Sequence, residues 1–146
     1  AGQARLTLTF IHPDGSPASQ SFELGAVTIT VPERSFAIPP MSHRVDHDFN
    51  DAIRLLGYDI TPDRITLYWQ SLKPLATRLT VFIHNFDPAG AFVGGSDSPP
   101  PRPTTSWLPG EVITDVRQFS VGEHFEIGWY DPVTGERFGE PYRVTK

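Results

Sequence analysis

Apolar and polar residues alternate with a period of two along several short segments of the chain. This pattern places one set of side chains on each face of an extended strand, so it predicts strands with one buried face. The alternation is strictest in RLTLTFI (5–11), RITLYWQSL (64–72) and HFEIGWY (124–130). Further strands are predicted at SFELGAVTITV (21–31), AIRLLGYDI (52–60), TRLTVFIHNF (77–86), EVITDVRQFSV (111–121) and EPYRVTK (140–146).

Turn-forming residues separate these segments. The chain has 15 prolines and 12 glycines, and clusters such as HPDGSP (12–17) favour tight turns between strands. Residues 32–51 are expected to form an irregular crossing connection, because their three prolines disfavour both helices and central strands. No segment has the period of an amphipathic helix. The pattern therefore predicts an all-β fold, an antiparallel β-sandwich of about 8–9 strands, either immunoglobulin-like or jelly-roll-like.

The length of 146 residues is that of one domain, and we expect a single β-sandwich domain over residues 1–146, cut or processed from a longer chain. Two segments share a plan of strand, Pro/Asp/Gly turn and polar strand: LTLTFIHPDGSPASQSFELG (6–25) and FEIGWYDPVTGERFGEPYRV (125–144). If this echo reflects repetition, the hairpin at residues 1–31 is the tail of a preceding repeat and residues 33–146 are the main unit. Otherwise the hairpin is an integral part of one sandwich.

The composition removes several classes of function. The chain has no cysteine, which excludes disulfides and thiolate chemistry. Its 12 basic and 17 acidic residues give a net charge of −5 without a basic cluster, which argues against nucleic-acid binding. No apolar stretch approaches the roughly 18 residues of a membrane-spanning helix, so we expect no direct membrane insertion of this segment.

Three aromatic residues are candidate ligand-binding residues: Trp107, Tyr68 and Tyr130. Trp107 stands in TTSWLPGE, directly before a Pro-Gly turn, where its indole either plugs one end of the sandwich or offers a flat face to a sugar ring. Tyr68 and Tyr130 occupy the strand faces opposite the core candidates Trp69 and Trp129. If their strands are neighbours, the two tyrosines form one aromatic patch, with ordinary cross-strand packing as the alternative.

Histidines and carboxylates suggest two metal sites, and a structural interpretation is favoured for both. His43 and His47 have the spacing of zinc ligands on a helix, but the proline-rich surroundings predict a solvated loop. A calcium site at an edge of the sandwich requires four carboxylates to meet, and capping of turns explains them as well: Asp97, Asp115, Asp131 and Glu136. We therefore assign no metal site and no cofactor. The chain also lacks a nucleophile-elbow motif, so we assign no catalytic residue.

Four motifs follow one another along the chain: FNDAIRLLGYDI (49–60), ITLYWQSLKPLATRLTVFIHNFDPAG (65–90), DSPPPRPTTSWLPGEVITD (97–115) and FEIGWYDPVTGERF (125–138). Over residues 33–140 this series resembles a β-sandwich module found toward the C-terminal side of multi-spanning membrane glycosyltransferases of the dolichyl-phosphate-mannose mannosyltransferase type. The resemblance implies a bacterial module outside the cytoplasm, and it supplies no catalytic residue.

We therefore expect a non-catalytic extracytoplasmic interaction or spacer module of a larger bacterial envelope protein, such as an accessory domain of a membrane glycosyltransferase. Its expected partners are neighbouring domains of the same chain or envelope glycan. One alternative is a carbohydrate-binding module, which exposes aromatic rings in one strip. The other is a glycosidase-like enzyme domain, which gathers carboxylates in a pocket.

Overall fold

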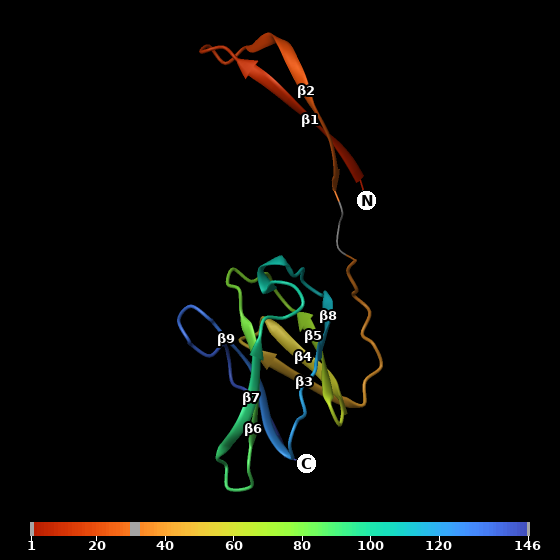
Figure 1. The fold of residues 1–146 in the computed structure, drawn as a ribbon, viewed down its shortest axis with the longest axis vertical. Coiled ribbons are helices and arrows are strands. Elements are labelled where there is room, and N and C mark those ends of the chain that lie inside the picture. The colour runs from red at the N-terminus through yellow and green to blue at the C-terminus, as the bar shows by residue number, and fades with distance from the viewer. Residues whose placement is uncertain (1, 30–32, 146) are drawn as a thin grey trace. The chain divides into compact units, whose positions relative to one another are not determined.

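The computed structural model describes residues 2–29 and 33–145 and confirms the all-β fold (Figure 1). The chain folds as two compact units, Ala1–Glu33 and Arg34–Lys146. The first unit contains one two-stranded sheet, the N-terminal hairpin, and the second contains two four-stranded antiparallel sheets, the sandwich unit. The described strands are β1 (Gly2–Ile11), β2 (Pro17–Ile29), β3 (His43–Phe49), β4 (Ile53–Thr61), β5 (Arg64–Ser71), β6 (Thr80–Phe86), β7 (Phe92–Ser98), β8 (Val112–Arg117), β9 (His124–Tyr130) and β10 (Tyr142–Thr145).

The core of the sandwich unit lies between its two sheets, which have the strand orders β3-β4-β5-β8 and β10-β9-β6-β7. Alternate residues of β5 and β9 point into this core, and Leu67, Trp69, Ile127 and Trp129 are fully buried. The rings of Trp69 and Trp129 meet edge to face across the two sheets, with centroids 4.7 Å apart. The core positions predicted for both tryptophans are confirmed. Among the described residues, no helix has the length and hydropathy to span a bilayer.

Strand β3 lies within residues 32–51, where the sequence predicted an irregular connection. It pairs antiparallel with β4, and a bulge interrupts the pairing between Arg44 and His47. Asp46 adopts a φ of 58° at this bulge. The extra residue at the bulge shifts the alternation of side chains along β3. The sequence of this strand therefore lacks the period of two by which the other strands were predicted. Strand β7 was not predicted either, so the ten described strands exceed the predicted eight or nine.

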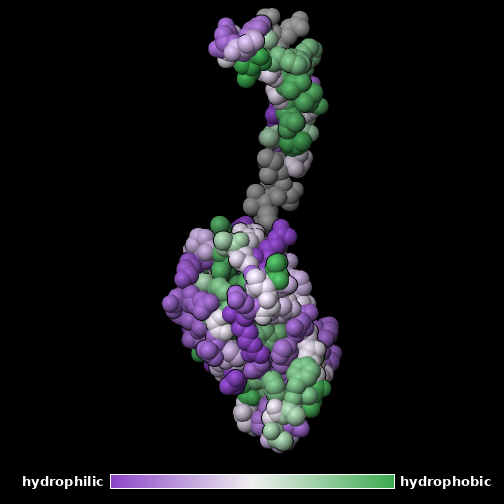
Figure 2. Space-filling model, turned by 90° about the vertical axis from the view of Figure 1, so that its left-hand side faces the viewer, coloured by the Kyte–Doolittle hydropathy of each residue, from purple (hydrophilic) through white to green (hydrophobic). Residues whose placement is uncertain are grey.

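The N-terminal hairpin has one apolar face. The register of β1 and β2 sets Leu8 opposite Phe22 and Ala4 opposite Val27, so their side chains share a face. Leu8, Phe10 and Phe22 remain 44–57% exposed. In Figure 2 hydrophobic (green) side chains run along this hairpin. A two-stranded sheet is marginally stable by itself in water.

Candidate functional site

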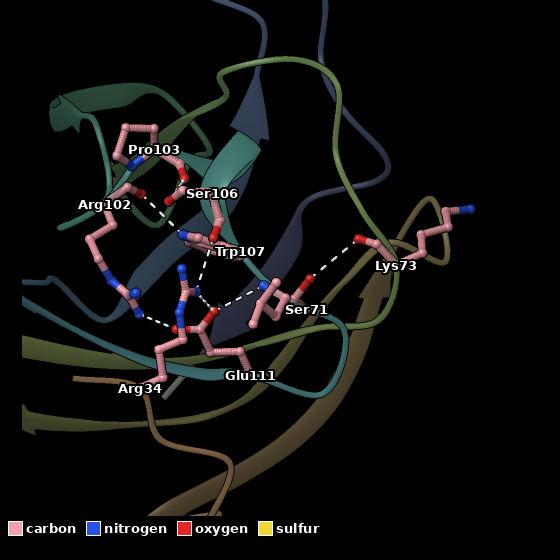
Figure 3. Close-up of polar contacts among 9 residues, drawn as sticks. Arg34, Ser71, Lys73, Arg102, Pro103, Ser106, Trp107 and Glu111 are labelled. Atoms are coloured by element: carbon pink, nitrogen blue, oxygen red, sulfur yellow. Dashed lines mark hydrogen bonds and ion pairs between the residues drawn. The ribbon is translucent and has the colours of Figure 1, made fainter. Parts of the chain in front are cut away.

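The loop that carries Trp107 folds back onto the core of the sandwich unit (Figure 3). A short 3-10 helix, Thr104–Ser106, leads into Trp107, which is 3% exposed. Its ring meets that of Trp129 edge to face at 5.7 Å, and its Nε1 donates to the carbonyl oxygen of Arg102 over 3.1 Å. Trp107 is therefore packed as a plug and offers no open ring face to a ligand.

Glu111 ends the same loop, and its carboxylate is fully buried. Arg34 Nη1 donates to Glu111 Oε2 over 2.6 Å, and Arg102 Nη2 donates to Oε1 (Figure 3). The backbone N–H of Leu108 donates to Oε2 over 2.9 Å. Burial alone raises the pKa of Glu111, but these donors outweigh burial and hold the pKa below the ordinary 4.5. The cluster fastens the loop to the start of β8, so its role is structural.

A second buried charge pair closes one side of the sandwich. Asp115 and Arg117 point inward from β8, and Arg117 Nη2 lies 2.8 Å from Asp115 Oδ2. Trp69 Nε1 donates to the same Asp115 oxygen over 3.3 Å. Arg117 Nη1 donates to Ser98 Oγ, at the end of β7, over 2.6 Å. Since β8 and β7 are edge strands of the two sheets, this pair joins their edges.

The side chains considered as metal ligands have other contacts. His43 stacks on Tyr58 with 4.8 Å between ring centroids, and His47 Nε2 lies 2.9 Å from the carbonyl oxygen of Glu140. Asp131 accepts a hydrogen bond from the backbone of its own turn over 2.8 Å. Among the residues that the structure describes, no group of three or more His, Cys, Asp or Glu side chains is arranged to hold a metal ion.

Tyr68 and Tyr130 lie on the outer faces of different sheets. Tyr68 belongs to β5 and Tyr130 to β9, and these strands are not neighbours. The condition for a shared patch of the two tyrosines, neighbouring strands, is therefore not met. Tyr68 Oη donates to Asp59 Oδ2 over 2.7 Å, and this bond raises the pKa of Tyr68 to about 12. The Tyr68 hydroxyl is thus engaged within its own sheet.

Tyr130 borders an open pocket of about 260 Å³ on the outer face of the β10-β9-β6-β7 sheet, the outer-face pocket. Phe82 lines its floor but is only 3% exposed, because its ring packs over Gly128 and the guanidinium carbon of Arg137 lies 4.7 Å from the ring centroid. A Cβ atom at Gly128 would come within 2.3 Å of that ring, so glycine makes room for it. Burial and the nearby Asp97 carboxylate raise the pKa of Tyr130. The remaining lining residues are His84, Asp97, Gly135 and Arg137.

Charged side chains form a chain of contacts across the same face. His84 Nε2 lies 3.0 Å from Asp97 Oδ1, and its Nδ1 lies 3.8 Å from Glu126 Oε1. Glu126 is only 4% exposed and pairs with Arg137 at 3.0 Å and with Arg143 at 3.4 Å. Carboxylate acceptors and guanidinium donors therefore stand side by side around an aromatic floor.

The sequence predicted Tyr130 in this site but missed His84, Glu126 and Arg137. The signal that could have found them was the alternation along β6 and β9, which sets His84 and Glu126 opposite the core positions of their strands. Their direct pairing across β6 and β9 depends on the strand order, which alternation does not give. Arg137 comes from the turn after β9, where no period applies.

Comparison of the chain with protein-family profiles, with curated proteins and with solved structures gives no match. The resemblance to modules beside membrane glycosyltransferases therefore remains a prediction from four motifs.

Proposed function

We propose that the chain is a non-catalytic interaction and spacer module of a larger bacterial envelope protein, outside the cytoplasm and beside neighbouring sandwiches. The observation that carries the proposal is the exposed apolar face of the N-terminal hairpin, whose β1 residues follow the same apolar alternation as the buried face of β9. One complete sandwich plus the last hairpin of another is a piece of a row of such units. The location, and a membrane glycosyltransferase as the parent protein, rest on the motif resemblance.

The apolar residues of β1 correspond in sequence to core residues of β9. When residues 6–25 are aligned with residues 125–144, Leu6, Leu8 and Phe10 correspond to Phe125, Ile127 and Trp129. The β9 residues are 0–2% exposed, because the facing sheet covers them, whereas the β1 residues are 44–57% exposed. Strands of a preceding sandwich, equivalent to β3 to β8, are the cover that this face lacks. A covering sheet would explain why β1 alternates apolar and polar residues, because a hairpin with both faces in water does not require an apolar face.

The turns of the two hairpins differ in length, although each contains a glycine with a positive φ. The Gly15 N–H donates to the carbonyl oxygen of His12, and the Gly135 N–H donates to that of Asp131, each over 2.8 Å. The φ angles of the two glycines are 86° and 77°. Glycine adopts this left-handed region without the steric cost that a side chain brings. The Gly15 bond spans three residues and the Gly135 bond spans four, so the support for repetition comes from the shared apolar pattern of β1 and β9.

Four described carboxyl groups have a displaced pKa, and in each the hydrogen-bond donors outweigh burial and lower it: Asp14, Asp48, Asp59 and Glu111. The general acid of a glycosidase needs the opposite, a carboxyl group whose pKa is raised. Release of nitrophenol from nitrophenyl glycosides by the purified chain would favour the glycosidase-like alternative and contradict this proposal.

Deletion of residues 1–33 is expected to leave the sandwich unit folded, with one cooperative thermal transition at the midpoint of the full chain. The reason is that both four-stranded sheets and the core cluster come from residues 34–146. Circular dichroism against temperature measures this. The matched deletion of residues 124–146 removes β9 and β10, and is expected to abolish the transition because β9 is hydrogen-bonded to β6 and contributes core residues.

The outcome of the first deletion separates the two interpretations of the hairpin. If the chain without residues 1–33 fails to fold, the hairpin is an integral part of one sandwich. That result would contradict the proposal of a row of units. A retained transition is the result that the proposal requires.

A further inference from the structure

We infer that β7 of the sandwich unit pairs edge to edge with β7 of a second copy of the chain, which joins the two copies of its sheet into one continuous sheet. Strand β7 ends the order β10-β9-β6-β7, and among the residues that the structure describes its outer edge has no partner strand (Figure 1). Self-association goes beyond the proposed function. The two do not depend on each other, because β7 lies wholly within the sandwich unit.

The other three edge strands of the sandwich unit carry features that disfavour pairing with another chain. A bulge interrupts β3, and β10 has only four residues. Strand β8 turns the charged side chains of Asp115 and Arg117 inward. The backbone N–H of its first residue, Val112, donates to the carbonyl oxygen of Ser35 over 2.8 Å, so part of this edge is covered.

Strand β7 lacks these features. Its sequence, FVGGSDS, contains no lysine, arginine or proline. From Gly94 to Ser98 it pairs with β6 without a bulge, and its two glycines let a second backbone approach closely. Arg117 of β8 binds the last residue, Ser98, over 2.6 Å. The backbone before Ser98 therefore presents donors and acceptors along one side to a further strand.

The symmetry of β7 suits pairing with itself. An antiparallel pair of identical strands has a two-fold axis, and two-fold dimers are the commonest homo-oligomers. Gly95 is the middle residue of Phe92–Ser98, so full overlap of the two strands sets Gly95 opposite Gly95 of the second copy. Each Asp97 then lies opposite a Val93, and the two carboxylates do not meet.

Phe92 supplies apolar area at the centre of this contact. Phe92 is 59% exposed, and Val93 beside it is 61% exposed. The Phe92 ring lies over Gly95, because a Cβ atom there would come within 3.3 Å of its Cε2, and its centroid lies 5.3 Å from that of His84. When the two Gly95 residues face each other, the two Phe92 rings meet on the outer face of the sheet. Each ring then covers apolar surface of the other.

The contact is small, so we expect a weak and reversible dimer. Each copy contributes the seven residues of β7, whereas interfaces of standard size use roughly 20–30 residues a side. The fraction of dimer should therefore depend on the concentration of the chain.

Sedimentation equilibrium of the full chain from about 1 μM to about 1 mM tests the inference. We expect the average mass to rise toward twice that of one chain. Gly94→Lys sets a charge on the edge and is expected to weaken the dimer about tenfold. A Cβ atom at Gly94 meets nothing within 4 Å, so the sandwich unit accommodates a side chain there. Val133→Lys, at a position 91% exposed after β9, adds the same charge and is expected to leave the association unchanged.

Phe92→Ala removes the ring and is also expected to weaken the dimer about tenfold. Its control is Phe36→Ala, because Phe36 is 54% exposed and lies outside β7. Unchanged melting temperatures of the Gly94 and Phe92 variants exclude loss of the fold as the cause.

Two results would overturn the inference. One is a full chain that stays monomeric over the whole range of concentration. The other is association that Gly94→Lys and Phe92→Ala leave unchanged. The copies would then meet through another surface, such as the N-terminal hairpin, which every variant retains.

Discussion

Replacing Trp129 with alanine is expected to lower the free energy of unfolding of the sandwich unit by about 3–5 kcal/mol. Trp129 is fully buried, and its ring meets Trp69 from the facing sheet and Trp107 from the loop before β8. The side chain therefore joins three separate parts of the chain. Its Nε1 has no hydrogen-bond partner among the described residues, so the loss comes from packing and from the cavity left behind.

Urea denaturation with linear extrapolation measures this loss, with Val133→Ala as the control. Val133 is 91% exposed, so its truncation is expected to change the free energy of unfolding by less than about 0.5 kcal/mol. A loss below about 1 kcal/mol for Trp129→Ala would contradict the described core, because a fully buried indole cannot be removed from it at such a small cost.

Replacing Glu111 with alanine is expected to cost about 3–5 kcal/mol at neutral pH, because the guanidinium groups of Arg34 and Arg102 lose the carboxylate that they share. The side chains of these arginines are only 23% and 24% exposed, so water replaces the lost partner poorly. Glu123→Ala, at an exposed position, is the control with an expected change within about 0.5 kcal/mol.

The Glu111 cluster also predicts a dependence on pH. Because the folded-state pKa of Glu111 lies below the ordinary 4.5, its ionisation stabilises the fold fully above that value. This contribution is lost as the pH falls through the lowered folded-state pKa. Glu111→Gln does not ionise, so the difference in free energy of unfolding between the unaltered chain and this variant is expected to shrink from pH 7 into acid. A difference that stays constant or grows would contradict the assignment.

The strands that the sequence predicted most clearly include two whose alternation is uninterrupted. Residues 64–72 and 124–130 keep a period of two because each strand has one face in the core, and both became strands, β5 and β9. The bulge at Asp46 broke this period in β3, and Gly94 and Gly95 left β7 without side chains to mark its faces. A bulge therefore explains the omission of β3, and the low strand propensity of two adjacent glycines explains that of β7.

The candidate site was predictable only in part, because its residues meet through strand order. Alternation set Tyr68 and Tyr130 opposite the core, as the structure has them, but it did not show that β9 pairs with β6 rather than with β5. The bond of Glu111 to Arg34 spans 77 positions of the chain, and no local spacing encodes such a contact. Trp107 was recognised as a candidate plug because the Pro-Gly turn folds its neighbours back on themselves.

The central claim is that residues 2–29 form the last hairpin of a preceding sandwich, and amide hydrogen exchange tests it most directly. The measurement compares β1 and β2 in the 146-residue chain with the same strands in the longest natural polypeptide that contains them. We predict fast exchange in the 146-residue chain, beside a protected β9, and protection equal to that of β9 in the longer polypeptide. Strong protection of the hairpin in the 146-residue chain, or fast exchange in both, would contradict the claim.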